Sequence, residues 1–127
     1  MKLLLDTNVF SNKKFLEWLK QQKTTAYMSS ISYVELFYHF LKKGRDEEFM
    51  DAFLKATGVE ILPFDLECAK ITSKSSIGRW DFKEHARDYM IGSLALKHGG
   101  LLVTENIKDF EWMKKRVKSP DEFLKTI

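Results

Sequence analysis

Acidic, hydroxyl and amide side chains follow two short apolar runs of the sequence. Asp6 comes directly after the run at residues 3–5. The run at residues 101–103 is followed by Thr104, Asn106 and Asp109. Each group has an ordinary explanation, because Asp, Asn and Thr accept hydrogen bonds from free backbone amides at turns and helix starts. Their recurrence after two apolar runs favours a shared chemical site.

Two further carboxylates lie within segments of helical periodicity. Glu35 stands three residues after Ser32, a spacing that fits a capping box at the start of a helix. Asp88 begins a helical face that continues with apolar residues such as Ile91, so its ionised form needs a compensating cation or hydrogen-bond donors. Arg87 is expected to point elsewhere, because adjacent residues of a helix lie on different faces. Asp88 is therefore predicted to be functional.

A divalent cation would allow these carboxylates to lie close together. Clustered carboxylates repel one another and raise some of their pKa values, and a cation offsets that repulsion. Oxygen-only ligands favour Mg²⁺ or Mn²⁺. Such an ion can lower the pKa of a bound water and neutralise a phosphoryl oxygen. The acidic residues therefore predict a magnesium or manganese site.

Other kinds of site find little support in the sequence. The histidines are His39, His85 and His98. None has a zinc-like spacing with Cys68, and we expect them to take no part in metal binding. An aspartyl-phosphate phosphatase would need a second acidic residue two positions after its nucleophile, where Asn8 stands here. No glycine-rich nucleotide-binding motif occurs.

Short apolar runs alternate with helical periodicity, which predicts an α/β fold. The expected strands are residues 3–5, 27–28, 59–64 and 101–103, with a fifth short strand at Val117. The expected helices are residues 14–22, 32–43, 45–57, 66–75, 83–98 and 121–126. Strands that are apolar on both faces indicate a mostly parallel sheet of about 4–5 strands between helices, a three-layer α/β/α arrangement. Ligands of such sheets bind beyond the carboxyl ends of the strands.

Length and composition indicate a single domain over residues 1–127. Apolar residues make up 44% of the chain and charged residues 31%, which provides a core and argues against disorder. The net charge of +3 permits an anionic partner without identifying one. The single cysteine excludes a disulfide scaffold, and no signal peptide or membrane segment is evident. We therefore expect a cytoplasmic protein.

Four segments resemble the motifs of PIN-domain ribonucleases, and most closely those of the VapC toxins of type II toxin–antitoxin pairs. They are LLDTNVF at residues 4–10, SISYVEL at 30–36, RDYMIGSLA at 87–95 and LVTENIKDF at 102–110. Each motif alone is weakly specific. Their order and spacing over nearly the whole chain are specific together, so the resemblance concerns the complete domain.

The resemblance implies a Mg²⁺- or Mn²⁺-dependent endoribonuclease that uses water as its nucleophile and leaves a 5′-phosphate and a 3′-hydroxyl. The implied metal ligands are Asp6, Glu35 and Asp88. Family members carry a fourth polar or acidic position after the last long strand, for which Asn106 and Asp109 compete. Asn106 stands where many relatives have Asp. Thr104 and Asn106 would orient the metal ligands.

RNA binding requires cations around the acidic residues. The candidates are Lys13, Arg79 and Arg87, although each alone is better explained as part of a solvated face. Trp80, next to Arg79 in a predicted loop, could stack on a base.

The resemblance also implies two protein partners, a cognate antitoxin and a second copy of the chain. Part of an aromatic cluster could serve as an interface, while core packing explains it equally well; its members are Tyr33, Phe37, Tyr38, Phe40, Phe49 and Phe53. The alternative function is a non-catalytic PIN-like module that binds RNA or protein. Retention of three acidic motif residues argues against that alternative.

Overall fold

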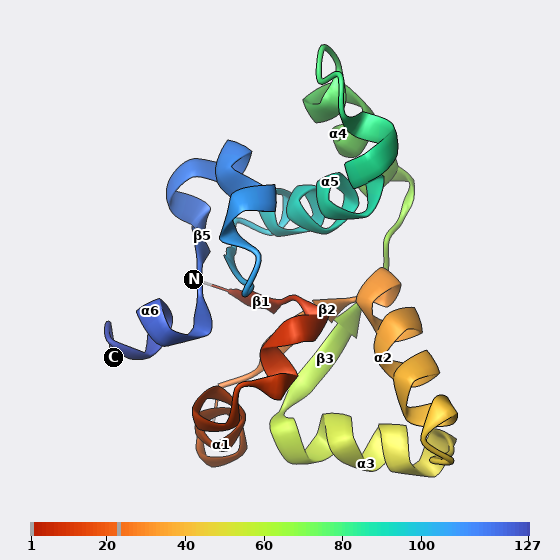
Figure 1. Ribbon diagram of the computed structural model, residues 1–127, viewed down its shortest axis with the longest axis vertical. Coiled ribbons are helices and arrows are strands. Elements are labelled where there is room, and N and C mark those ends of the chain that lie inside the picture. The colour runs from red at the N-terminus through yellow and green to blue at the C-terminus, as the bar shows by residue number, and fades with distance from the viewer. Residues whose placement is uncertain (1, 23) are drawn as a thin grey trace.

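The computed structural model describes residues 2–22 and 24–127, whose strands form one parallel sheet in the order β3-β2-β1-β4-β5 (Figure 1). The strands are β1 (Leu3–Leu5), β2 (Ala26–Ser29), β3 (Val59–Leu62), β4 (Leu101–Val103) and β5 (Val117–Lys118). Every pair of neighbouring strands is parallel. The predicted parallel sheet is confirmed, and so is its short fifth strand at Val117.

Strand β1 occupies the centre of the sheet and contributes side chains to both of its faces. Leu5 packs into a core with Phe15 and Met28, whereas Leu4 packs into a second core with Leu94. Successive residues of a strand point to opposite faces, so a continuous apolar run serves two cores. This arrangement explains why β1 reads as three consecutive leucines.

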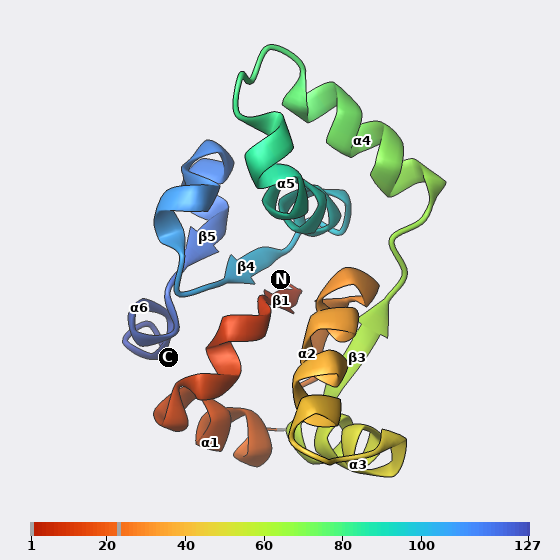
Figure 2. The same cartoon turned by 45° about the vertical axis from the view of Figure 1, so that its right-hand side comes forward.

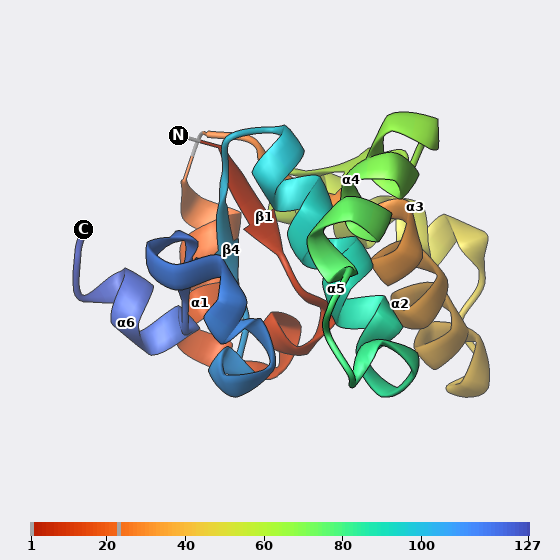
Figure 3. The ribbon, with the colours of Figure 1, turned by 90° about the horizontal axis from the view of Figure 1, so that it is seen from above.

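Helices cover both faces of the sheet, which confirms the three-layer prediction (Figures 1 and 2). One layer contains α1 (Lys13–Gln21), α2 (Ser30–Lys42), α3 (Glu47–Thr57) and α6 (Pro120–Leu124). The other contains α4 (Leu66–Ser76), α5 (Phe82–Lys97) and the 3-10 segment η2 (Ile107–Arg116). Figure 3 shows α5 crossing the sheet beside β1 and β4. Among the described residues, no helix combines the length and the apolar character needed to span a membrane.

Most helix boundaries fall within two residues of the prediction, and local capping explains them. Asp46 caps α3 by accepting a hydrogen bond from the backbone N–H of Phe49, and Gly58 ends that helix with a φ of 68°. A left-handed residue of this kind is favourable for glycine and lets β3 begin at once. The start of α2 differs from the prediction, because Ser29 rather than Ser32 is its N-cap. The predicted capping box between Ser32 and Glu35 is therefore wrong, and the Glu35 side chain is free to act elsewhere.

Candidate active site

Asp6 lies at the carboxyl end of β1 and is fully buried. Its backbone N–H continues the sheet by donating to the carbonyl of Val103, which places Asp6 beside the end of β4. The Thr104 hydroxyl donates to Asp6 Oδ2 at 2.8 Å, and the backbone N–H of Thr7 donates to Oδ1 at 2.8 Å. The carboxylate caps the 3-10 turn η1 (Thr7–Ser11) and is also held by Thr104 at the end of β4, so the capping explanation of Asp6 is correct.

Glu35 reaches the same region from α2. Its Oε1 accepts a hydrogen bond from the Thr7 hydroxyl at 2.9 Å, and its side chain remains 38% exposed. A carboxylate that is held on one side and open to water on the other is suited to receive a soluble ligand. Thr7 contacts both Glu35 and Asp6 and thereby links the two carboxylates.

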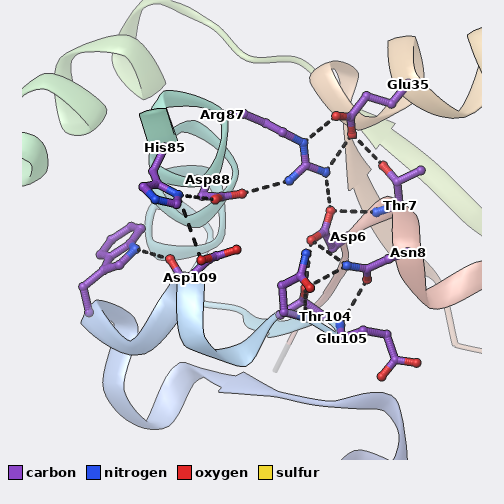
Figure 4. A network of polar contacts seen from close by, with 12 residues as sticks. Asp6, Thr7, Asn8, Glu35, His85, Arg87, Asp88, Thr104, Glu105 and Asp109 are labelled. Atoms are coloured by element: carbon purple, nitrogen blue, oxygen red, sulfur yellow. Dashed lines mark hydrogen bonds and ion pairs between the residues drawn. The ribbon is translucent and has the colours of Figure 1, made fainter. Parts of the chain in front are cut away.

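The Arg87 guanidinium lies among the three predicted metal ligands (Figure 4). It donates to Asp6 Oδ1 at 2.5 Å, to Glu35 Oε1 at 2.7 Å and to Asp88 Oδ1 at 2.9 Å. The expectation that Arg87 points away from Asp88 is wrong. The position in the helix sets only the direction of the Cα–Cβ bond. The long aliphatic chain of Arg87 bends back, so its planar guanidinium reaches all three carboxylates.

The protonation properties of this cluster follow from burial and from the guanidinium. Burial acts to lower the pKa of Arg87, but its hydrogen bonds to Glu35 and the charge of Asp6 outweigh burial and raise that pKa. Burial likewise acts to raise the pKa of Glu35, and the hydrogen bonds from Arg87 and Thr7 outweigh it, so the pKa falls below its usual value. For Asp88 burial dominates, and its pKa is raised. The charge of Glu35 is thus stabilised by Arg87, whereas burial makes the charged form of Asp88 more costly.

The second oxygen of Asp88 faces a different group of residues. His85 Nδ1 lies 3.3 Å from Asp88 Oδ2 and 4.0 Å from Asp109 Oδ1. The expectation that all three histidines stand apart from the acidic site is therefore wrong for His85. The spacing of His85 to Cys68 gives no sign of this contact. Its spacing of three residues to Asp88 does, because residues three apart in a helix are neighbours on its surface.

The residues after β4 separate into a buried support and an exposed segment. Thr104 is fully buried, and its hydroxyl also accepts the backbone N–H of Asn106 at 3.1 Å. Asn106 is exposed and makes no side-chain capping bond to η2, so helix capping does not explain this residue. Asp109 is the residue of this segment that lies beside His85 and Asp88.

The predicted RNA-binding cations occupy three different settings. Arg79 stacks over the rings of Tyr89 and Trp112, with its guanidinium carbon 5.5 Å from each centroid. Lys13 is exposed at the start of α1, while Arg87 is engaged with the carboxylates. Trp80, next to Arg79, has 93% of its surface exposed to solvent. Arg79 and Trp80 thus form an exposed cationic and aromatic edge before α5.

These observations define an α/β domain whose parallel sheet gathers carboxylates from β1, α2 and α5 at its C-terminal edge. A model of the PIN domain family matches residues 3–115, and the chain belongs to that family. A search among curated proteins found no match.

Solved structures of toxin–antitoxin complexes share this fold. FitAcB from Neisseria gonorrhoeae is 27% identical, with a TM-score of 0.72 and coverage of 93% of this chain and 97% of that chain. VapBC2 from Rickettsia felis, bound to a DNA fragment from their promoter, is 26% identical, with a TM-score of 0.68 and coverage of 94% and 98%. DNA-bound VapBC from Salmonella typhimurium is 25% identical, with a TM-score of 0.71 and the same coverage. The resemblance to VapC-type PIN domains is confirmed.

Proposed function

We propose that this PIN domain is a divalent-metal-dependent endoribonuclease in which Asp6, Glu35 and Asp88 bind Mg²⁺ or Mn²⁺. The observation that carries the proposal is the convergence of these carboxylates, from three separate elements, on one cationic group. Residues that already surround a guanidinium fit a metal ion, because both neutralise several carboxylate oxygens at once. When bound, the ion would activate a water and stabilise the charge that develops on the scissile phosphate.

The surrounding residues hold this arrangement in place. Thr104 fixes one oxygen of Asp6 from β4, and Thr7 fixes one oxygen of Glu35. Asn8 supports the same segment, because its side-chain carbonyl accepts the backbone N–H of Glu105 at 3.1 Å. Such hydrogen bonds keep ligands in one orientation, which lowers the cost of gathering them around a metal. Asp109 is our candidate for the fourth position, because it lies near Asp88.

The substrate would approach the open side of the acidic cluster. Lys13, Arg79 and Arg87 are our candidates for contacts to the RNA backbone, and Trp80 for stacking on a base. Arg87 would have to leave at least part of the carboxylate cluster to contact a phosphate. Because Arg87 is paired with all three proposed metal ligands, its release toward a phosphate would free these carboxylates for the metal ion.

Cleavage of a pooled, end-labelled set of structured RNAs tests the enzymatic proposal. The purified chain is expected to cut RNA with Mg²⁺ or Mn²⁺ and to lose this activity in EDTA. Asp6→Asn and Asp88→Asn should each reduce cleavage by about 100-fold or more, while Asp46→Asn, a change at a helix cap outside the site, should not. RNA binding without metal-dependent cutting would instead favour the non-catalytic module.

We further propose that the chain is the toxin of a type II toxin–antitoxin pair that acts in the cytoplasm and forms a homodimer. The outer face of α2 supports a protein interface, since Val34, Tyr38 and Leu41 follow helical spacing and are 67%, 61% and 50% exposed. Phe40 belongs to the core instead, because its ring packs edge-on against Phe53 at a centroid distance of 5.2 Å. The aromatic cluster is thus divided between core and surface.

Co-expression with the product of a small neighbouring reading frame tests the pairing. A cognate antitoxin should co-purify with the chain and suppress its RNA cleavage. Sedimentation of the chain alone tests the dimer. Val34→Asp combined with Tyr38→Asp should shift a dimer to a monomer, and Lys70→Asp, an exposed change on α4 in the opposite layer, should not. A wild-type monomer at high concentration would contradict the dimer.

A further inference from the structure

His85, Asp88 and Asp109 form a compact group of potential metal ligands. One ligand atom from each side chain lies within 4.8 Å of the others. Asp88 and His85 come from α5, and Asp109 comes from η2, so the group joins two elements that are distant in sequence. Neighbouring ligand atoms of an octahedral ion with bonds of about 2.1 Å lie about 3 Å apart. His85 Nδ1 lies 3.3 Å from Asp88 Oδ2 and 4.0 Å from Asp109 Oδ1, so small side-chain rotations would bring all three atoms to one ion.

This group lies on the side of Asp88 that faces away from Arg87. Figure 4 shows Asp88 between Arg87 and His85, with one carboxylate oxygen directed to each of them. The Arg87 guanidinium neutralises Asp6 and Glu35 more directly than it does Asp109. A second cation beside His85 would therefore meet carboxylate charge that Arg87 leaves only partly compensated.

Water and ions can reach this side of the cluster. The side chains of His85 and Asp109 are 38% and 39% exposed, while that of Asp88 is 13% exposed. A hydrated ion could thus bind two accessible ligands first and then the more buried carboxylate. This combination of one buried and two accessible ligands suits an exchangeable ion.

Packing between α5 and η2 holds the ligands near one another. The backbone of His85 departs from helical geometry, with φ −122° and ψ 21°, which makes a kink in the first turn of α5. Trp112 packs against Tyr89 of α5 at a centroid distance of 5.2 Å, and its indole N–H donates to the carbonyl of Asp109 at 3.2 Å. The tryptophan thereby ties the backbone that carries Asp109 to the helix that carries Asp88.

The ligand types indicate which ions would bind. Carboxylate oxygens accept Mg²⁺ and Mn²⁺ alike, whereas an imidazole nitrogen suits transition metals and contributes little to Mg²⁺ binding. One histidine with two carboxylates is a ligand set that transition metals accept while keeping open positions for water. The imidazole nitrogen of His85 would therefore favour Mn²⁺ over Mg²⁺, whereas carboxylates alone bind both ions.

We infer that His85, Asp88 and Asp109 bind a divalent transition-metal ion, with His85 as a nitrogen ligand that makes the protein bind Mn²⁺ in preference to Mg²⁺. This inference rests on the proposed function only for its catalytic consequence, because ion binding can be measured without RNA. His85 thus gives the nuclease a metal preference that the three family carboxylates do not provide.

Titration of the full chain with Mn²⁺, followed by electron paramagnetic resonance, tests the inference. Pulsed measurements on the bound ion should show modulation from a coordinated ¹⁴N nucleus. His85→Ala should remove this modulation and weaken Mn²⁺ binding at least ~10-fold, with little change in Mg²⁺ binding. His85→Asp should restore Mn²⁺ binding through oxygen without the nitrogen signal. His39→Ala is the matched control, because His39 is exposed on α2 and lies outside the group.

Three results would overturn the inference: bound Mn²⁺ without a nitrogen signal, equal Mn²⁺ affinity in the wild type and His85→Ala, or no Mn²⁺ binding by the wild type. Thermal melting of His85→Ala separates a lost ligand from a lost fold. RNA cleavage in Mg²⁺ alone distinguishes the two proposals, because it can persist when the nitrogen ligand is absent. Failure of cleavage with every ion, together with an intact nitrogen signal, would reject the nuclease and retain the metal site.

Discussion

Arg87 and Asp6, which lie 81 residues apart in the sequence, form an ion pair at the C-terminal edge of the sheet. Asp6 is fully buried, so its charge depends on the donors around it. Arg87 provides the only guanidinium that pairs with Asp6 among residues 2–22 and 24–127, and it also binds Glu35 and Asp88. The arginine therefore stabilises the acidic cluster and would compete with the metal ion that we propose to bind there.

Replacement of Arg87 by methionine should expose this competition. In metal-free buffer, Arg87→Met should destabilise the fold by about 2 kcal/mol, less than for a fully buried pair because the side chain is 34% exposed. Saturating Mg²⁺ should then raise the melting temperature of the variant more than that of the wild type. Calorimetry with and without Mg²⁺ measures both effects, and equal metal stabilisation of the two proteins would contradict the competition.

Thr104→Val should weaken the support of Asp6. The Thr104 hydroxyl donates to Asp6 Oδ2, and its loss leaves a buried carboxylate oxygen with one donor fewer. We expect a loss of about 1–3 kcal/mol in stability and a fall of about 10–100-fold in cleavage. Thr104→Ser keeps the hydroxyl and should retain most of both properties. If valine and serine behave alike in melting and cleavage assays, the hydroxyl has no such role.

Gly92→Ala should disturb the contact between α5 and η2. A Cβ at this position would lie 2.5 Å from Cζ2 of Trp112, whose ring is packed against Tyr89. The gain in helix propensity, about 1 kcal/mol, should be outweighed by overpacking of about 1–3 kcal/mol. Ser93→Ala is the control on the next residue, where the buried hydroxyl has no hydrogen-bond partner within the described residues, so its loss should be neutral or stabilising. Unfolding in denaturant measures the stability of both variants, and a Gly92→Ala protein more stable than the wild type would refute the prediction.

The pairing of Asp65 with Lys97 should make part of the stability depend on pH. The hydrogen bond from Lys97 at 2.8 Å, followed by that from the backbone N–H of Cys68, holds the pKa of Asp65 well below its usual range. A lowered carboxyl pKa contributes stability that is fully present above the unfolded value of about 3.9 and is lost as the pH falls through the folded value.

Asp65→Asn keeps a residue able to cap α4 but removes this charge. The variant should melt a few degrees below the wild type at pH 7, and the difference should shrink at pH 3. Melting curves at the two pH values test the sign. A difference that grows toward low pH would contradict it.

The sheet and the position of Asp6 were predictable because strong local signals agreed with a general rule of parallel sheets. A leucine run closed by Asp6 indicates a strand buried on both faces, and parallel topology brings its carboxyl end beside that of the 101–103 strand. Asp6 and Thr104 therefore meet in space as their positions in the two strands require.

The direction of Arg87 and the role of Glu35 were not predictable from local spacing. Helical periodicity places a Cβ atom on a face, but it does not determine where a long, charged side chain ends. Helix α2 begins at Ser30, two residues before the predicted start, because Ser29 rather than Ser32 is its N-cap. The Glu35 carboxylate therefore accepts hydrogen bonds from Thr7 and Arg87 instead of capping the helix. Both outcomes depend on tertiary contacts that no short segment encodes.

His85 illustrates a further reason why part of the site escaped sequence reasoning. His85 lies near Asp109 where the helical geometry of α5 is interrupted at His85 and where η2 packs against α5 through Trp112. A non-helical residue inside a helix and an irregular 3-10 segment have weak sequence signals. Asp88 was identifiable because its apolar helical face is strongly periodic.

The division of Asp88 between two neighbours implies a thermodynamic linkage. One oxygen faces Arg87 and the other faces His85, so each neighbour responds to how far the other has neutralised the shared carboxylate. An RNA phosphate that draws Arg87 away leaves more negative charge for an ion beside His85, and the ion in turn makes Arg87 easier to release. Such coupling is reciprocal, so substrate and ion would raise each other's affinity by the same factor. Protein molecules that hold only the RNA or only the ion would then be less populated than if the two bound independently.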